Sequence, residues 1–446
     1  MGALKLHTLK QKLWAIVAVS FVARAVVLFL SPNTPSALAP DEGTYAGLAK
    51  WVSESKPASE FPGLDGVLYL QGRSLFLPTI SFIKFGMNEL DAVRLTSSIY
   101  GFLGLCAVVY LICKLLKSNA SRVFEDKKIE RLTIVLVFIF AFLPSHFVWS
   151  NLGLRESPNE FWLIITFLCV FMLYREGESK KLLLALSIAI SIVCTFSSRP
   201  QVGWVLVASL LIYSMSNLRN KFTYLLITSV VSGLFAGYFV TTSFTSATSD
   251  VNVPIGPSTT STNASKLAKS TNASKLANLA NVAIDQVKVL PGRQIGNQAG
   301  AASSIERLAC PWSESSEIGK YGCLVFRAPY MTLTFLFRPL PFIDTTSRSS
   351  TFAAAENTIW ILMFGLIVYR IFRYRRIPFI RALAPSMTFL FLFVVGAGSY
   401  QGNMGTAFRH KSLILWIVLL LLFAVFWRNQ EKSKELQGNN SQENAV

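Results

Sequence analysis

Apolar stretches that approach the thickness of a bilayer recur along this chain, and they constrain its fold more than any other feature. A helix needs about 20 apolar residues to cross the hydrocarbon of a membrane. The sequence therefore predicts an all-α polytopic membrane protein with about ten transmembrane helices, of which the fifth, sixth and ninth are short. The candidate spans are Leu13–Leu30, Leu95–Leu116, Leu132–Val148, Pro158–Tyr174, Leu182–Phe196, Val202–Met215, Phe222–Val240, Asn357–Phe372, Ala382–Val395 and Leu413–Trp427.

The overall composition points to the same class of fold. Of the 446 residues, 52% are hydrophobic and only 15% are charged, whereas soluble domains carry about 25% charged residues. The net charge of +18 does not indicate nucleic-acid binding, because Lys and Arg gather in the cytoplasmic loops of membrane proteins. We therefore expect membrane lipids, and no nucleic acid, among the partners of the chain.

The basic loops predict how the chain is oriented. With ten spans, every cluster of Lys and Arg falls on one side, which is then the cytoplasm of a multi-pass plasma (inner) membrane protein. Both termini lie on that side, the first span is a retained signal anchor, and the polar segment 428–446 is a disordered tail. The clusters are Lys5 to Lys12, Lys114 to Arg131, Arg175 to Lys181, Arg219 to Lys221, and Arg370 to Arg381.

On the opposite, outer side of the membrane we predict two long loops, and these loops define the regions of the chain. Residues 1–240 form a membrane core that contains a first outer loop, 31–94, and residues 357–427 form the C-terminal spans. Between them, 241–356 is a large extracytoplasmic loop region. It contains a tandem repeat over 261–278, which we interpret as flexible linker. It also contains Cys310 and Cys323, which are candidates for a disulfide because that compartment is usually oxidising.

Two adjacent acids stand at the start of the first outer loop. After Asp41 and Glu42, the residues Tyr45, Leu48, Ala49 and Val52 follow helical spacing, which predicts an amphipathic surface helix. A second surface helix is expected over Leu75–Phe85, which is too short to cross the membrane. In one reading, Asp41 is an N-cap and Glu42 a first-turn acid that complements the helix dipole. In the other, the carboxylates face a reaction site.

Further charged residues gather at the outer ends of the predicted spans. Each of them alone is explained as an interfacial anchor, since Arg and Lys snorkel at helix ends. Together they predict a basic, water-accessible cavity at the outer face, with Asp41, Glu42 and Glu156 as its acids. The basic and neighbouring residues are Arg24, Arg155, Arg199, Arg338, Arg409, His410 and Lys411.

Such a cavity suits a lipid-linked phosphate, because guanidinium groups bind phosphate bidentately and an apolar groove takes the chain. Transfer of a sugar from a polyprenyl phosphate needs a carboxylate base for the acceptor hydroxyl and fixed positive charge for the departing phosphate. In that scheme Asp41 is the base, and Arg155, Arg199 or Arg409 holds the phosphate. No covalent nucleophile is required. No paired Asp-x-Asp metal site is present in the sequence, so we predict no cofactor and have no support for a divalent metal.

The order of these features resembles the GT-C superfamily of integral membrane glycosyltransferases, in the branch of the protein O-mannosyltransferases and the lipid A aminoarabinose transferase. The resemblance covers about residues 13–175 and rests on Asp41, Glu42 and Tyr45, the helix Leu75–Phe85, Arg94 at the start of the second span, Pro144, and Glu156. It implies that Asp41 is the catalytic base, that Glu42 and Glu156 assist, and that Tyr45 and Arg94 line the substrate site. Two features depart from the family: Glu156 replaces the usual Asp, and no large soluble C-terminal domain follows.

The resulting prediction is a membrane glycosyltransferase that moves a sugar from a polyprenyl-phosphate donor to a hydroxyl of a glycan, lipid or protein acceptor. A polymerase or ligase of lipid-linked oligosaccharide on the same scaffold stays open. So does a transporter or flippase of a lipid-linked or anionic solute, although the sequence lacks the inverted repeats typical of that class. A non-catalytic membrane scaffold is the third alternative, and it would leave the outer acids and arginines freely replaceable.

Overall fold

The computed structural model describes residues 2–30, 40–61, 72–117, 127–174, 180–218, 221–242, 317–344, 348–373, 380–400 and 404–443. The repeat 261–278 and Cys310 therefore lie outside the described residues, together with most of the predicted loop region 241–356. Within the described ranges the secondary structure is helical and contains no strand.

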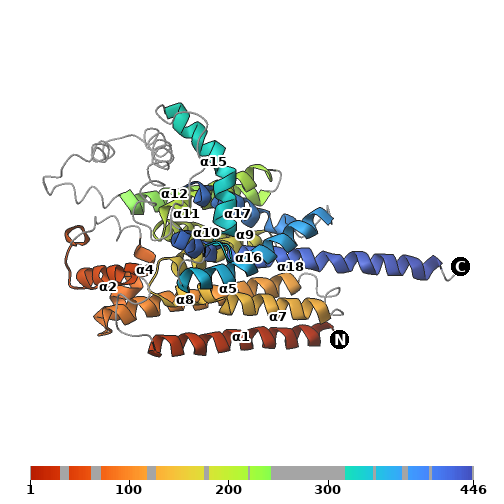
Figure 1. Ribbon diagram of the computed structural model, residues 1–446, viewed down its shortest axis with the longest axis horizontal. Coiled ribbons are helices and arrows are strands. Elements are labelled where there is room, and N and C mark those ends of the chain that lie inside the picture. The colour runs from red at the N-terminus through yellow and green to blue at the C-terminus, as the bar shows by residue number, and fades with distance from the viewer. Residues whose placement is uncertain are drawn as a thin grey trace.

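The helices follow one another along the chain as a bundle with smaller helices at one end (Figure 1). In chain order they are α1 (Gly2–Leu30), α2 (Pro40–Ser53), η1 (Ala58–Glu60), α4 (Arg73–Lys84), α5 (Glu89–Lys117), α7 (Lys127–Phe142), α8 (Pro144–Asn151), α9 (Glu156–Leu173), α10 (Lys181–Phe196), α11 (Pro200–Met215), α12 (Lys221–Thr242), α15 (Glu317–Phe337), α16 (Arg348–Arg373), α17 (Ile380–Tyr400) and α18 (Met404–Glu443).

Each of the ten predicted apolar stretches lies in helix, but the stretches are not equally able to cross a membrane. Five helices among the described residues are long and apolar enough, and α7 with α8 adds a sixth candidate if the bent pair counts as one span. The four remaining stretches, in α10, α11, α12 and α17, form shorter apolar helices. The all-α membrane class is thus confirmed, whereas ten spans and their sidedness stay predictions.

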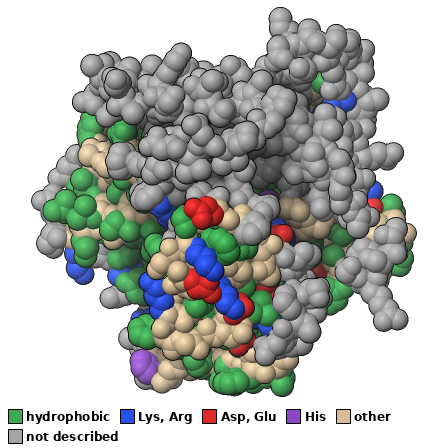
Figure 2. Space-filling view, turned by 90° about the vertical axis from the view of Figure 1, so that its left-hand side faces the viewer, with side chains coloured by type: hydrophobic (Ala, Val, Ile, Leu, Met, Phe, Trp, Pro, Cys, Tyr) green, Lys and Arg blue, Asp and Glu red, His purple; other side chains and the backbone are tan. Residues whose placement is uncertain are grey.

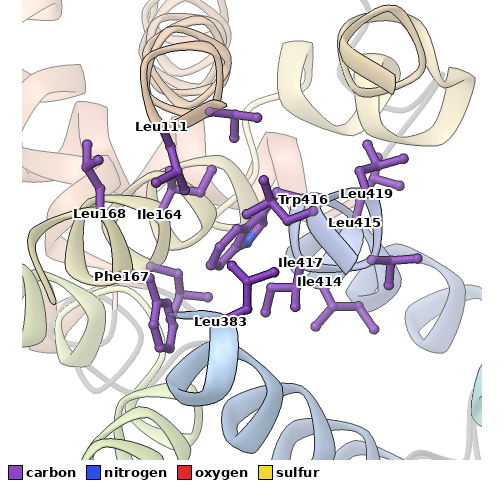
Figure 3. Close-up of a cluster of buried hydrophobic side chains, with 14 of the residues drawn as sticks. Leu111, Ile164, Phe167, Leu168, Leu383, Ile414, Leu415, Trp416, Ile417 and Leu419 are labelled. Atoms are coloured by element: carbon purple, nitrogen blue, oxygen red, sulfur yellow. The ribbon is translucent and has the colours of Figure 1, made fainter. Parts of the chain in front are cut away.

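The main core is built around α18. Trp416 of α18 packs against Phe167 of α9 with ring centroids 5.5 Å apart, and Leu383 of α17 lies beside them (Figure 3). The apolar part of α18 is buried along nearly its whole length, whereas α1 exposes large apolar side chains such as Phe21 and Phe29. A helix that is apolar and buried all round is the centre of its bundle. Exposed apolar side chains on a peripheral helix of this kind fit contact with lipid.

A second, smaller core forms at the end of the molecule that carries α2 and α4. Tyr45 and Leu48 of α2 pack on Leu75 and Phe76 of α4, and Leu154 of the turn before α9 joins them. Both predicted surface helices are therefore present as helices. Acidic and basic side chains gather on this end (Figure 2), where exposed ion pairs join Lys50 to Glu89 and Lys56 to Glu54. Charge at this density fits an aqueous surface and not a hydrocarbon one.

Four details differ from the expectations. Helix α2 begins at Pro40, so Asp41 is a first-turn residue and not an N-cap. The third apolar stretch bends by 43° between α7 and α8, because the backbone breaks at Leu143 just before Pro144, which has no N–H for a helical hydrogen bond. The loop region 241–356 contains α15, a helix of 21 residues. Helix α18 continues to Glu443, through a segment rich in Glu, Lys and Gln, which favour helix.

Candidate functional site

Asp41 and Arg409 meet where the first turn of α2 approaches the start of α18. Arg409 Nη1 donates a hydrogen bond of 3.0 Å to Asp41 Oδ2. The Asp41 side chain is 46% exposed, whereas that of Arg409 is 15% exposed. The carboxylate is therefore open to solvent on one side and held by a guanidinium on the other. The structure thus brings together the predicted base and one of the predicted phosphate-binding residues.

Glu156 lies behind this pair and holds two arginines. Arg409 Nε is 3.0 Å from Glu156 Oε1, and Arg199 Nη2 donates a hydrogen bond to the same oxygen. Glu156 is the first residue of α9, where the helix dipole favours a negative charge. Its side chain is only 4% exposed. A buried carboxylate that is surrounded by guanidinium groups orients them and is not available as a base.

His410 extends the same group of residues toward Arg199. Arg199 Nη1 lies 2.8 Å from His410 Nε2. Because a guanidinium can only donate, the ring nitrogen accepts, and the imidazole is neutral in this arrangement. The group then holds two guanidinium charges from Arg199 and Arg409 against two carboxylates from Asp41 and Glu156. Arg155 adds a further positive charge beside it, so the whole cluster is basic.

Tyr45 connects α2 to Arg155. Arg155 Nε donates a hydrogen bond of 3.0 Å to Tyr45 Oη, and the Arg155 guanidinium carbon lies 5.3 Å from the centre of the Tyr45 ring. The ring also contacts Phe76 edge to face, with centroids 5.9 Å apart. Tyr45 is thus anchored in the small core, and its hydroxyl positions Arg155 next to the Asp41 cluster.

Glu42 has different surroundings from its neighbour Asp41. Its side chain is fully buried, and both carboxylate oxygens accept from Arg94, at 2.6 Å from Nε and 3.0 Å from Nη2. The backbone N–H of Gly153 donates to it as well, at 3.0 Å. This arrangement clamps α2 to α5 and to the turn 152–155. The geometry favours Glu42 and Arg94 as positioning residues, in place of the catalytic and substrate-binding roles that the sequence predicted for them.

Arg338 and Lys411 make their contacts at a different place, the turn between α15 and α16, which Lys411 reaches from α18. Arg338 forms a bidentate pair with Asp344, at 3.0 and 2.6 Å. Lys411 Nζ donates to Arg338 O at 2.7 Å and to Asn357 Oδ1 at 2.6 Å. These contacts hold the turn 338–344 and do not involve Asp41 or Glu156. The neighbouring residues Pro339 and His410 did not indicate that Arg338 and Lys411 would lie apart from Asp41 and Glu156.

Arg24 also lies away from the Asp41 cluster. Its side chain is buried, Nη1 donates to Ser150 Oγ at 2.5 Å, and the guanidinium carbon lies 5.2 Å from the ring of Phe147. Both partners are on α8. The sequence predicted substrate binding for Arg24, but its contacts are those of a residue that holds α8.

Two further groups were missed by the sequence reasoning. Gly153 is required by packing, since a Cβ at this position would lie 2.4 Å from Val93 Cγ1. His146 and Glu160 form a buried pair, with Nε2 and Oε2 2.9 Å apart. The only sequence signal for the pair was that Glu160 lies one helical turn after Glu156, on the same face of α9.

Five of the six cysteines lie among the residues that the structure describes. Cys323 is disulfide-bonded, and its predicted partner Cys310 lies outside the described residues. The four cysteines within the apolar helices are free thiols. Among the residues that the structure describes, no group of three or more His, Cys, Asp or Glu side chains could hold a metal ion.

The fold and the site thus define a helical membrane protein with a largely buried cluster of arginines around Glu156 and one solvent-exposed carboxylate, Asp41. No protein family matches the chain, and no curated protein matches it. Among solved structures, the chain is similar to ArnT from Cupriavidus metallidurans in the apo state, with a TM-score of 0.38 and 14% sequence identity. That match covers 90% of this chain and 77% of the ArnT chain.

Proposed function

We propose that this protein is a membrane glycosyltransferase that transfers a sugar from a polyprenyl-phosphate donor to a hydroxyl group of an acceptor. The observation that carries the proposal is the contact between Asp41 and Arg409, residues 368 positions apart in the sequence. It places a solvent-accessible carboxylate directly beside a basic cluster that is itself protected from water. Sugar transfer from a phosphate needs both elements next to each other.

In the proposed reaction, Asp41 accepts the proton of the acceptor hydroxyl as that oxygen attacks the anomeric carbon of the sugar. The bond between this carbon and the phosphate oxygen breaks, and the phosphate leaves with the bonding electrons. Arg409, Arg199 and Arg155 stabilise the charge that develops on the phosphate. Glu156 keeps two of these guanidinium groups in place, so little reorganisation is needed during the reaction. The arrangement needs no covalent intermediate.

The substitution Asp41→Asn tests the base. It keeps the size of the side chain and an oxygen that can accept from Arg409, but it removes the ability to take a proton. We expect sugar transfer to fall by about 10²–10⁴-fold while the amount of folded protein in the membrane is unchanged. The matched control is Glu54→Gln, because Glu54 is an exposed acid just after α2 with a lysine partner. Transfer that persists in Asp41→Asn would remove Asp41 as the base.

The substrates themselves are found by mass spectrometry of lipid-linked sugars and surface glycans, in cells with and without the gene. Accumulation of a polyprenyl-phosphate monosaccharide together with a truncated glycan supports transfer of single sugars. Accumulation of a lipid-linked oligosaccharide instead supports a polymerase or ligase. A donor that accumulates on the cytoplasmic leaflet only, with transfer intact in broken membranes, indicates a flippase.

A further inference from the structure

Helix α8 is a short helix that directly precedes the turn leading to Glu156 of the candidate site. It consists of Pro144–Asn151, between the 43° bend after α7 and the turn 152–155. Two turns of helix are too few to be stable alone in water, so tertiary contacts decide where α8 lies. On the side of α5 the packing is tight, since a Cβ on Gly101 would be 2.7 Å from the Cβ of Ser150.

The buried polar side chains of α8 each contact a different helix. Ser145 donates to Glu356 of α16 through its backbone N–H, at 2.7 Å, and also through its hydroxyl. His146 pairs with Glu160 of α9, Ser150 accepts from Arg24 of α1, and Asn151 Oδ1 accepts from Ser98 of α5 at 2.9 Å. Polar contacts in four directions define the place and the rotation of α8, which apolar packing alone specifies less sharply.

The end of α8 leads directly into the groups that hold α2. Gly153, two residues after α8, donates its N–H to Glu42, and Arg155 donates to Tyr45. The next residue, Glu156, holds Arg199 and Arg409. A displacement of α8 therefore affects the contacts of three residues, Gly153, Arg155 and Glu156, which all lie within five residues of the end of α8.

The pair of His146 and Glu160 stands out among these contacts. The two side chains are 1% and 5% exposed, and each keeps a second polar atom, His146 Nδ1 and Glu160 Oε1, that is buried without a hydrogen-bond partner. Buried pairs of this kind cost stability in comparison with apolar residues of the same volume. The pair is therefore poorly explained as a stabilising contact. It joins α8 to α9 one helical turn from Glu156.

We propose that His146 and Glu160 are positioning residues for the transfer reaction, because their hydrogen bond sets the orientation of α8 and thereby the contacts of Gly153, Arg155 and Glu156 with α2 and α18. The role in the reaction rests on the proposed function. The mechanical part, in which the pair controls how α2 is held, does not depend on any substrate.

The mechanical part is tested with a cysteine at Thr44, a partly buried residue of α2 next to Tyr45. In the Thr44→Cys protein, the rate of labelling by a membrane-impermeant maleimide reports how tightly α2 is held, and the protein without this change gives the background from the native cysteines. We expect His146→Phe, which keeps an aromatic ring against Phe140 but removes the hydrogen bond, to raise the labelling rate about tenfold. The control is Thr166→Val, which removes a buried hydrogen bond to Ser191 further along α9.

Two conservative variants distinguish positioning from a general loss of structure. His146→Gln offers a side-chain amide to Glu160 and is expected to restore slow labelling, whereas Glu160→Ala is expected to label as fast as His146→Phe. Once transfer can be measured, His146→Phe is expected to raise the KM for the donor more than it lowers kcat, because Arg155 and the two arginines held by Glu156 are the proposed donor-binding groups. If His146→Phe does not reach the membrane, Glu160→Ala takes its place, and Glu160→Gln, which keeps an acceptor oxygen, is the control that is expected to label about as slowly as the parent.

The outcomes separate the two proposals. Labelling that is equal in His146→Phe, Glu160→Ala and Thr166→Val overturns the positioning role, whatever the protein catalyses. Faster labelling without any sugar transfer by the parent protein leaves the positioning role in place and overturns the proposed function. A KM for the donor that is unchanged in a fast-labelling variant overturns the link between the two.

Discussion

Asp41 and Glu42 are adjacent in the sequence, yet their carboxylates lie in opposite surroundings. Asp41 is 46% exposed and faces Arg409, whereas Glu42 is fully buried and binds Arg94 and the backbone of Gly153. Successive residues of a helix point about 100° apart, so one turn of α2 presents one acid to the site and the other to the protein interior. This division of roles leads to the first prediction.

Replacing Glu42 with Gln should destabilise the protein more than any exposed substitution on α2. The change removes the carboxylate charge that pairs with the buried Arg94 guanidinium, and breaking a buried pair of this kind costs about 3–5 kcal/mol. The measurement is thermal unfolding in detergent, with Glu89→Gln as the control, since Glu89 pairs with Lys50 at the surface. Equal melting temperatures for the two variants would contradict the clamp.

Gly153→Ala should displace the turn that leads into Glu156. The added Cβ would lie 2.4 Å from Val93 Cγ1, and Val93 is fully buried. Overpacking of this degree costs about 1–3 kcal/mol. We expect the double variant with Val93→Ala to recover part of the lost stability. Gly365→Ala is the matched control, because a Cβ there meets no atom within 4 Å. A Gly153→Ala protein as stable and active as that control would show that the turn adapts.

Tyr45→Phe should weaken donor binding while leaving the fold intact. The ring keeps its contact with Phe76, but the hydrogen bond from Arg155 is lost. Hydrogen bonds to charged groups contribute about 1.5–3 kcal/mol, so we expect a KM for the donor at least about tenfold higher and a smaller change in kcat. The substitution Tyr110→Phe, on the exposed side of α5, should have no effect on either constant. A KM equal to that of the parent would contradict the role of the Tyr45 hydroxyl in positioning Arg155 for donor binding.

Arg199→Lys and Arg338→Lys should affect different properties of the protein, the affinity for the donor and the thermal stability, respectively. Arg199 contacts Glu156 and His410 through two separate nitrogens of its planar guanidinium, and a lysine at this position has a single nitrogen that does not reproduce this geometry. We expect it to lower the affinity for a polyprenyl phosphate by about 10- to 100-fold, measured with a fluorescent short-chain analogue. Arg338 pairs with Asp344 in the turn 338–344, so its replacement should lower the melting temperature and leave the affinity unchanged. Reversed results would place the phosphate next to Arg338.

Much of the secondary structure could be predicted from local patterns. The ten apolar stretches all lie in helices. The amphipathic spacing after Asp41 predicted α2, and the short apolar stretch Leu75–Phe85 predicted α4. Periodicity and length carry this information because they depend only on residues close in the chain. The bend between α7 and α8 was missed, since a proline inside an apolar stretch is also compatible with a straight span in a membrane.

The sequence by itself determined that this protein is an all-α membrane protein with charged residues concentrated beside its helix ends, because hydrophobicity and helical period are local properties. Only the tertiary structure decided which charges meet. It brought Asp41 to Arg409 and Glu156 to Arg199, and it placed Arg24 of α1 against α8 and Arg338 in a separate turn. The physical reason is that a guanidinium pairs with the nearest carboxylate in space, and helix packing, not distance along the chain, sets that neighbour.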